Sequence, residues 1–282
     1  MTELPPIAVP ELIARLDTLV AAHGPGVVAF DGDGTLWSGD VGDDFLHAFL
    51  ERGELRPEAA PVLARAAARS GGDEGLAGRA LLRRLVLRYE EGSLDEELFY
   101  ELTAVVCAGW ARHEVDAFVR QVLAAVPLAP RLHGEAMALV GWARERGVAV
   151  RIVSASPAPG VVLAAEAVGV RPDEVIAVTA EAHGEVTGTA ARRPIPYGPG
   201  KVEALRGQVG SAPLHAAFGD NRFDVDLLRA ATVPVAIRPK ARLRAAASLV
   251  PGLPELRPVD FPGPRHQGSL TMCCPRGPPP RP

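Results

Sequence analysis

One stretch near the N-terminus constrains the fold of this chain more than any other. Val27–Phe30 follows the breakers Gly24–Gly26, a pattern that is typical of a short buried strand. The string Asp-Gly-Asp-Gly-Thr, residues 31–35, comes directly after this strand. Because ligands bind at the carboxyl ends of strands in open α/β sheets, acidic and glycine residues at this point indicate a ligand site.

The rest of the chain alternates between apolar runs and helical windows. Further strands are predicted at 148–153, 174–178, 214–218 and 233–237, and helical windows separate them. Strands that alternate with helices predict an α/β fold with a parallel sheet, covered by helices on both faces.

Residues 43–130 depart from this alternation. Four consecutive helices are predicted there, at 57–69, 76–91, 94–110 and 113–125, with no strand between them. We therefore expect two segments, 1–42 and 131–256, to form the core, and residues 43–130 to form a helical insertion. Residues 257–282 are rich in Pro, Gly and Arg, and are predicted to be a disordered tail.

Composition excludes several classes of protein. Of the 282 residues, 48% are hydrophobic and the formal net charge is −4, so the chain can bury a core and lacks the basic character of nucleic-acid binders. Three cysteines are too few for a disulfide framework, and no apolar run approaches the ~18 residues that cross a bilayer. The acidic, proline-broken N-terminus does not resemble a signal peptide. We expect a cytoplasmic protein without nucleic-acid or membrane partners; the sequence does not indicate its oligomeric state.

Other strand ends carry residues of the same chemical kind. Ser154 follows the second predicted strand, and Asp220 follows the fourth, with Asp224 one helical turn later. The carboxyl ends of parallel strands meet at one edge, so these carboxylates and those of residues 31 and 33 would repel one another without a cation among them. An all-oxygen ligand set of this kind predicts Mg²⁺.

Such a site suits phosphoryl transfer to a carboxylate. A carboxylate that attacks phosphorus forms an aspartyl-phosphate and divides one difficult displacement into two easier ones. Attack of an anion on an anion needs compensating positive charge, from the metal and from a lysine. Lys201 is one of two lysines among 30 basic residues, and it lies at a turn before a predicted helix, which favours it for this role.

These residues together resemble the motifs of the haloacid dehalogenase (HAD) superfamily. The string from Val27 to Thr35 resembles its first motif, Ser154 its second, Lys201 its third, and Gly219–Asp224 its fourth, all in the order of the family. The resemblance implies a Rossmann-like core, with residues 43–130 as a C1-type cap. The length of this insertion is most similar to the phosphoserine-phosphatase branch.

The resemblance also implies chemical roles. Asp31 would be the nucleophile, and Asp33 would act as general acid and base. The carboxylates of Asp31 and Asp220, with the backbone carbonyl of Asp33, would hold Mg²⁺, and Asp224 would lie near the metal as a further ligand or would orient Lys201.

Substrate binding is implied for a second group of residues. The phosphoryl oxygens would contact Ser154 and Lys201, helped by backbone N–H groups near Thr35 and Ala155. Asp40 stands where phosphoserine phosphatases carry a glutamate for the substrate ammonium, and is one methylene shorter. Arg84 is expected to bind a substrate carboxylate, with Arg83 and Arg88 as alternatives. Trp37 is expected either to pack in the core or to wall the substrate pocket.

The sequence thus predicts a Mg²⁺-dependent phosphomonoesterase for a small phosphorylated metabolite, such as phosphoserine or a related amino-alcohol phosphate. A dehalogenase of the same superfamily would use the first aspartate but has no need of the second, so the presence of Asp33 argues against this alternative. A phosphotransferase remains an alternative, as does a non-catalytic binding or regulatory module, although the latter would be expected to have lost a motif and all four are present here.

Overall fold

The computed structural model describes residues 3–259 of the chain. The predicted disordered tail therefore lies almost wholly outside the described residues, from residue 260 onward. In the described part, every helix is either too short or too polar to cross a membrane.

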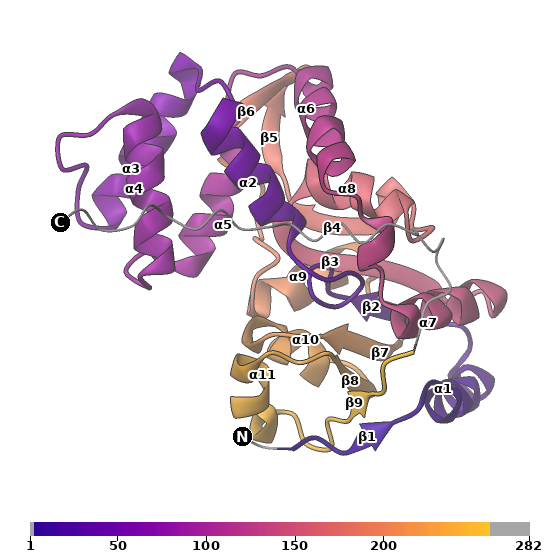
Figure 1. Ribbon diagram of the computed structural model, residues 1–282. Helices are drawn as coiled ribbons and strands as arrows, with labels where there is room; N and C mark the ends of the chain where they lie inside the picture. Colours follow the sequence, from indigo (N-terminus) through magenta and orange to yellow (C-terminus); the bar gives the residue numbers. More distant parts are fainter. Residues whose placement is uncertain (1–2, 260–282) are drawn as a thin grey trace, which may run out of the picture.

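A parallel sheet forms the centre of the core (Figure 1). Its strands lie in the order β1-β9-β8-β7-β2-β3-β4, and every neighbouring pair is parallel. The strands are β1 (Pro6–Ile7), β2 (Val27–Phe30), β3 (Ala149–Pro157), β4 (Val175–Val178), β7 (Leu214–Gly219), β8 (Val233–Ile237) and β9 (Glu255–Leu256). The chain adds β3 and β4 on one side of β2, and β7 and β8 on the other. This change of direction places a ligand crevice at the carboxyl end of β2, and the sheet confirms the predicted α/β class.

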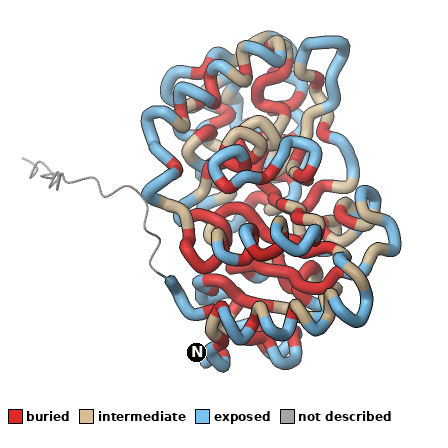
Figure 2. Tube along the Cα trace, turned by 90° about the vertical axis from the view of Figure 1, so that its right-hand side faces the viewer, coloured by how far each residue is buried: buried red, intermediate tan, exposed pale blue. Residues whose placement is uncertain are grey.

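Both faces of the sheet are covered by helices. Successive side chains of a strand point to opposite faces, so Val28 and Phe30 pack in one apolar cluster while Val27 and Ala29 pack in another. The first cluster includes residues of α1 (Val9–His23), α7 (Gly134–Glu145) and α8 (Ala158–Glu166). The second includes residues of α9 (Pro199–Val209), α10 (Val225–Arg229) and α11 (Ala241–Ala245). Buried segments accordingly run through the middle of the core in Figure 2.

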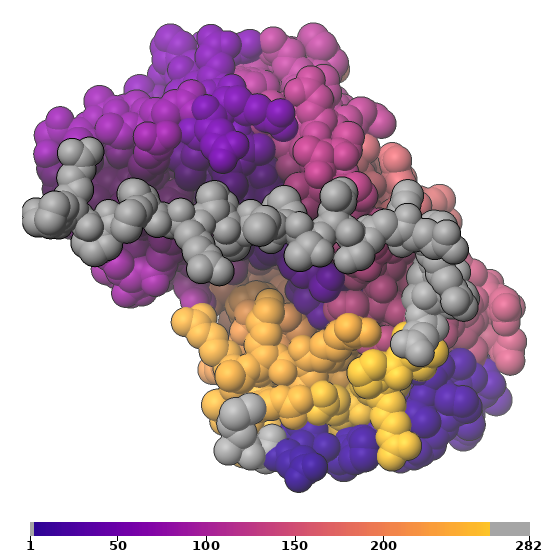
Figure 3. Space-filling view, in the orientation of Figure 1, coloured from indigo at the N-terminus to yellow at the C-terminus, as the bar shows by residue number. Residues whose placement is uncertain are grey.

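Between β2 and α7 the chain forms a group of helices with a third apolar cluster. These helices are α2 (Val41–Arg52), α3 (Ala60–Arg69), α4 (Gly78–Glu90), α5 (Glu96–Val105) and α6 (Arg112–Ala125). A hairpin of β5 (Ala180–His183) and β6 (Val186–Ala191) extends from the core beside them. In Figure 3 this group, coloured purple to magenta, lies over the orange and yellow part of the core. The four predicted helices correspond to α3–α6.

Helix α2 is not among the predicted helices, and the expected start of the insertion at residue 43 falls inside it. The Asp40 side chain accepts hydrogen bonds from the backbone N–H groups of Gly42 and Asp43, at 2.8 and 3.0 Å, and so caps this helix. Strands β1 and β9 were not expected either. Each has two residues, which is too short for a periodic pattern to show.

Candidate active site

The first motif is held at the carboxyl end of β2. The Asp31 N–H donates to the carbonyl of Phe218 on β7, at 2.9 Å, so the chain stays in register with the sheet as the strand ends. A tight turn follows, in which the Leu36 N–H donates to the Gly32 carbonyl at 2.8 Å. The Asp31 and Asp33 side chains are consequently buried at the strand end.

Gly34 permits close contact between this turn and the fourth motif. Its φ of +84° lies in the left-handed region, which side chains rarely adopt. A Cβ at this position would lie 2.0 Å from Asp220 Oδ2. The glycine therefore lets the first motif lie directly against the carboxylate of the fourth.

Lys201 lies between two carboxylates. Its Nζ is 2.6 Å from Asp31 Oδ1 and 2.6 Å from Asp224 Oδ1, and the lysine is completely buried at the first turn of α9. Burial disfavours the ammonium, but the carboxylates of Asp224 and Asp31 outweigh burial and raise the pKa of Lys201. The face of Phe223 lies 5.1 Å from Nζ, which adds a cation–π contact. Lys201 is thus a permanently charged ammonium in contact with Asp31.

Three carboxylates crowd this part of the site. Asp31, Asp220 and Asp224 each offer one oxygen, and these oxygens lie within 4.8 Å of one another. Burial, followed by repulsion from Asp224, raises the pKa of Asp31 well above its usual range and that of Asp220 to about 6. The ionised forms need more positive charge than Lys201 supplies.

Asp220 is the carboxylate that is least satisfied by the protein. Both of its oxygens are buried, and Oδ1 accepts no hydrogen bond. Oδ2 is contacted by one side chain, Lys240, whose Nζ lies 2.8 Å away as an ion pair. Buried oxygens without donors are uncommon in folded proteins. Together with the neighbouring carboxylate of Asp31 they form an oxygen set that fits a small divalent cation.

Asp224 already has partners within the protein. Its Oδ1 accepts from Lys201, and its Oδ2 accepts from the backbone N–H groups of Asp220 and Asn221, at 3.0 and 2.9 Å. These bonds fix the turn after β7 and orient Lys201. The predicted part of Asp224 in metal binding stays a prediction.

Asp33 is fixed by three hydrogen bonds. Trp37 Nε1 and the Val41 N–H donate to Oδ1, and Ser156 Oγ donates to Oδ2, each at 2.7 Å. Burial, with a smaller contribution from the charge of Asp40, raises the pKa of Asp33 to about 7. A carboxyl group with this pKa can both donate and accept a proton near neutral pH.

Two of these partners extend the sequence-based view of the site. Trp37 was expected either to pack or to contact substrate; it is fully buried and donates to Asp33, so it packs. Ser156 was assigned no role from the sequence, and it is the hydroxyl donor to Asp33. No periodic pattern marks such a donor, because the contact joins residues 123 positions apart.

A cavity of about 190 Å³ opens onto Asp31 and Asp33. The predicted residues Ser154, Ala155 and Asp40 line it. Other lining residues are Asp43, Tyr89, Tyr100, Ser156, Asn221, Phe223, Lys240 and Arg242. Thr35 is not among them: its side chain is buried, with Oγ1 3.5 Å from Asp31 Oδ2. The first, second and fourth motifs and the helical group thus meet around one space.

Arg84 is not brought to this cavity. Its guanidinium pairs with Glu74 at 3.1 Å and with Glu91 at 3.4 Å. The alternative Arg88 is buried against Glu74 and Ser70, and Arg83 is exposed. Carboxylates of the helical group therefore hold Arg84 and Arg88, and the position of Arg84 does not support the expected contact with substrate.

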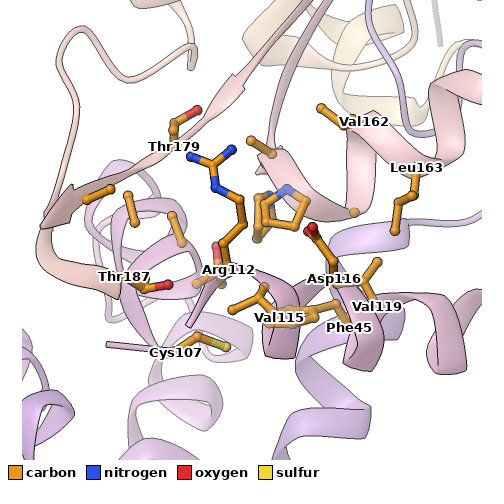
Figure 4. A pocket seen from close by; sticks show the side chains of 18 of the residues that line it. Phe45, Cys107, Arg112, Val115, Asp116, Val119, Val162, Leu163, Thr179 and Thr187 are labelled. Carbon is orange, nitrogen blue, oxygen red and sulfur yellow. The ribbon is translucent and has the colours of Figure 1, made fainter. Parts of the chain in front are cut away.

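A second cavity, of about 310 Å³, lies where α5 and α6 face α8 and the β5–β6 hairpin (Figure 4). Apolar side chains such as Phe45, Val115 and Leu163 line it, with Arg112 and Asp116 among them. None of the four motifs contributes a residue to this larger cavity, so the smaller one at Asp31 is the candidate active site.

Comparison with known proteins shows the family. A family model described as haloacid dehalogenase-like hydrolase matches residues 28–229, which include all four motifs. The chain therefore belongs to the haloacid dehalogenase-like hydrolases, as its motifs predict. No curated protein matches the chain.

Solved structures share the fold at low sequence identity. A protein of unknown function from Bordetella pertussis Tohama I is 23% identical, with 82% of this chain and 97% of that chain covered and a TM-score of 0.61. A HAD family hydrolase from Salmonella enterica serovar Typhi is 16% identical, with coverages of 84% and 74% and a TM-score of 0.51. A substrate-bound phosphoserine phosphatase complex is also similar, at 15% identity, coverages of 78% and 89% and a TM-score of 0.48.

Proposed function

We propose that this hydrolase is a Mg²⁺-dependent phosphomonoesterase that forms a phosphoryl intermediate on Asp31. The observation that carries the proposal is the position of Asp31. Its carboxylate contacts the buried Lys201 ammonium and lies close to Asp220, whose buried Oδ1 accepts no hydrogen bond. A nucleophilic carboxylate needs this arrangement, because it must approach an anionic phosphate.

The first half of the reaction transfers the phosphoryl group to Asp31. A carboxylate oxygen of Asp31 forms a bond to phosphorus, the bond from phosphorus to the ester oxygen breaks, and Asp33 gives its proton to the leaving alkoxide. The pKa of about 7 allows Asp33 to hold this proton near neutral pH. Ser156 and Trp37 keep its carboxyl group beside the cavity.

The second half restores the enzyme. Asp33, now ionised, takes a proton from a water molecule as the water oxygen attacks phosphorus, and the bond from phosphorus to Asp31 breaks. Inorganic phosphate leaves, and both aspartates return to their starting state. Mg²⁺, held by Asp31, Asp220 and the Asp33 carbonyl, would supply positive charge to the phosphoryl oxygens.

The phosphate would bind where Ser154 and Ala155 line the cavity beside Asp31. The Ser154 hydroxyl and backbone N–H groups at this end of β3 are suitable donors to phosphoryl oxygens. Lys201 provides a cation in contact with Asp31. The predicted phosphate-binding role of Thr35 is proposed for its backbone, since its side chain is buried.

A small substrate fits the size and the cover of the site. The cavity is about 190 Å³, and Tyr89 and Tyr100 of the helical group line it. We propose that residues 43–130 act as the cap that closes over the leaving group. Asp40 lines the cavity and would contact the amino group of phosphoserine or a related amino-alcohol phosphate.

Phosphate release from a panel of esters tests this proposal. The panel contains p-nitrophenyl phosphate, phosphoserine, phosphoethanolamine and a sugar phosphate, each with Mg²⁺ and with a chelator. We expect Mg²⁺-dependent release by the wild type and none by Asp31→Asn. Asp116→Asn, which removes an aspartate from the other cavity, is the matched control and should retain activity.

The same panel separates the rival functions. Transfer of the phosphoryl group to an added alcohol in preference to water would indicate a phosphotransferase. Release and transfer both absent with every ester would indicate a binding or regulatory module and would refute the proposal.

A further inference from the structure

Lys240 is the second of the two lysines in this chain, and it also contacts the acidic site. Of the 30 lysine and arginine residues, the other 28 are arginines. Lys201 contacts Asp31 and Asp224, and Lys240 contacts Asp220. Compact ammonium groups therefore occur in this chain only at the three clustered carboxylates.

The backbone places Lys240 at this point. It follows β8, whose carboxyl end adjoins that of β7, and its N–H donates to the Asp220 carbonyl at 2.7 Å. Arg238, two residues earlier, adopts a φ of +45° and donates to the buried Glu135 at 2.7 Å. A non-glycine residue in this region is strained, so the turn is held by its surroundings. The ion pair of Lys240 thus belongs to a fixed turn rather than to a surface loop.

The contact satisfies charge on Asp220 without filling its hydrogen-bonding capacity. Nζ is 2.8 Å from Oδ2, and the buried Oδ1 has no hydrogen-bond donor. The Lys240 side chain is 50% exposed, and it lines the catalytic cavity. Its ammonium can therefore move into solvent when a cation takes its place at Asp220, whereas Lys201 is fully buried.

We propose that Lys240 is a positioning residue that neutralises Asp220 in the metal-free protein and thereby weakens and sets the affinity for Mg²⁺. A cation that binds the Asp220 oxygens must displace the ammonium or approach it against charge repulsion. The inference rests on the proposed Mg²⁺ site, but it does not depend on the identity of the substrate or on turnover.

Calorimetric titration of Mg²⁺ into the metal-free protein at pH 8 tests this role. Lys240→Gln is expected to bind Mg²⁺ at least tenfold more tightly than the wild type, which corresponds to about 1.4 kcal/mol. Lys240→Arg keeps the charge and should bind Mg²⁺ more weakly than Lys240→Gln. Arg242→Gln is the matched control, because Arg242 lines the same cavity but pairs with Glu96 at 2.7 Å.

Thermal unfolding supplies a readout that is independent of activity. Without metal, Lys240→Gln should unfold at a lower temperature than the wild type, because the clustered carboxylates lose a counter-ion. The stabilisation by saturating Mg²⁺ should be larger in the variant. If Lys240→Gln does not fold, Lys240→Met, which keeps the aliphatic stem, takes its place in both measurements.

The outcomes distinguish this inference from the proposed function. If the wild type binds Mg²⁺ and Lys240→Gln binds it equally or more weakly, the role of Lys240 is overturned but the metal site is not. Wild-type protein that binds no Mg²⁺ overturns the metal site and this inference with it. Tighter binding in Arg242→Gln as well would show a general effect of cavity charge and would also overturn the specific role of Lys240.

Discussion

Replacement of Gly34 by alanine should disable the site through one methyl group. The new Cβ would lie 2.0 Å from Asp220 Oδ2 and 2.6 Å from its Cγ, whereas ordinary contacts begin at 3.4 Å. The carboxylate would have to move by about 1 Å or more. A displacement of this size in a catalytic group can cost about 10²-fold in rate. We expect a comparable loss of kcat/KM, together with weaker binding of Mg²⁺.

The backbone cost of this substitution must be separated from the displacement of Asp220. Gly34 has a φ of +84°, and an L-residue in the left-handed region costs roughly 1–2 kcal/mol. Gly147 has a φ of +65°, and a Cβ there would meet nothing within 4 Å. Gly147→Ala is therefore the matched control, with backbone strain and no steric conflict.

Both variants should be less stable by similar amounts from the backbone alone. For a domain of this size, roughly 1–2 kcal/mol lowers Tm by about 2–8 °C. Calorimetric unfolding measures this effect, while titration of Mg²⁺ and assays of phosphate release measure the effect on the site. Gly147→Ala should retain wild-type metal affinity and activity below its Tm. If Gly34→Ala also retains them, the close contact between the first and fourth motifs has no functional role.

Three further substitutions test other contacts of the site. Asp40→Asn should lower the pKa of Asp33, because the charge of Asp40 adds to the effect of burial in raising that pKa. As the pH rises, kcat/KM falls because the general acid loses its proton, and in the variant this fall should occur at lower pH. An unchanged pH profile would contradict this. Arg84→Ala should leave kcat/KM for phosphoserine unchanged, since its guanidinium is held by carboxylates of the helical group; a selective loss would return it to the substrate site. Lys201→Met should lower the free energy of unfolding by about 3–5 kcal/mol and abolish turnover, because it leaves two buried carboxylates uncompensated. Urea unfolding measures this loss, and an unchanged free energy of unfolding would refute the importance of the ion pairs.

The sequence was sufficient for the parts of the site that lie at strand ends. Strand β2 is an apolar run between breakers, and its carboxylates occur where a parallel sheet collects ligand-binding residues. Because the strands are parallel, Asp31 and Asp220 had to meet once both strands were recognised. The same logic did not reach Lys240, because it lies three residues beyond β8 and matches no motif.

The helical group was harder to predict in detail. Its helices show in the apolar periodicity, but periodicity does not tell which polar residue faces the cavity. Arg84 was expected at the substrate because the family resemblance implies a cap arginine there, with Arg83 and Arg88 as alternatives. Its actual partner, Glu74, lies ten residues earlier, before α4 begins, and only the folded chain shows that the two meet.

Helix α2 and the hydrogen bonds of Asp33 likewise depend on side-chain contacts that the sequence pattern does not show. From the sequence, Asp40 was predicted to contact the substrate. In the structure its side chain accepts hydrogen bonds from the backbone and caps the start of α2. Trp37 and Ser156 converge on Asp33 from a turn and from a different strand. Side-chain hydrogen bonds of this kind are specific to packing and leave no periodic signal in the sequence.

Detection of a phosphoryl group on Asp31 tests the central claim most directly. The protein is mixed with Mg²⁺ and a substrate that it hydrolyses, quenched in acid within the first turnover, and digested for mass spectrometry. We predict one phosphoryl group on the peptide that contains Asp31, absent from Asp31→Asn and from a sample treated with hydroxylamine. Phosphate release at the wild-type rate without this modification, or by the Asp31→Asn variant, would contradict the account.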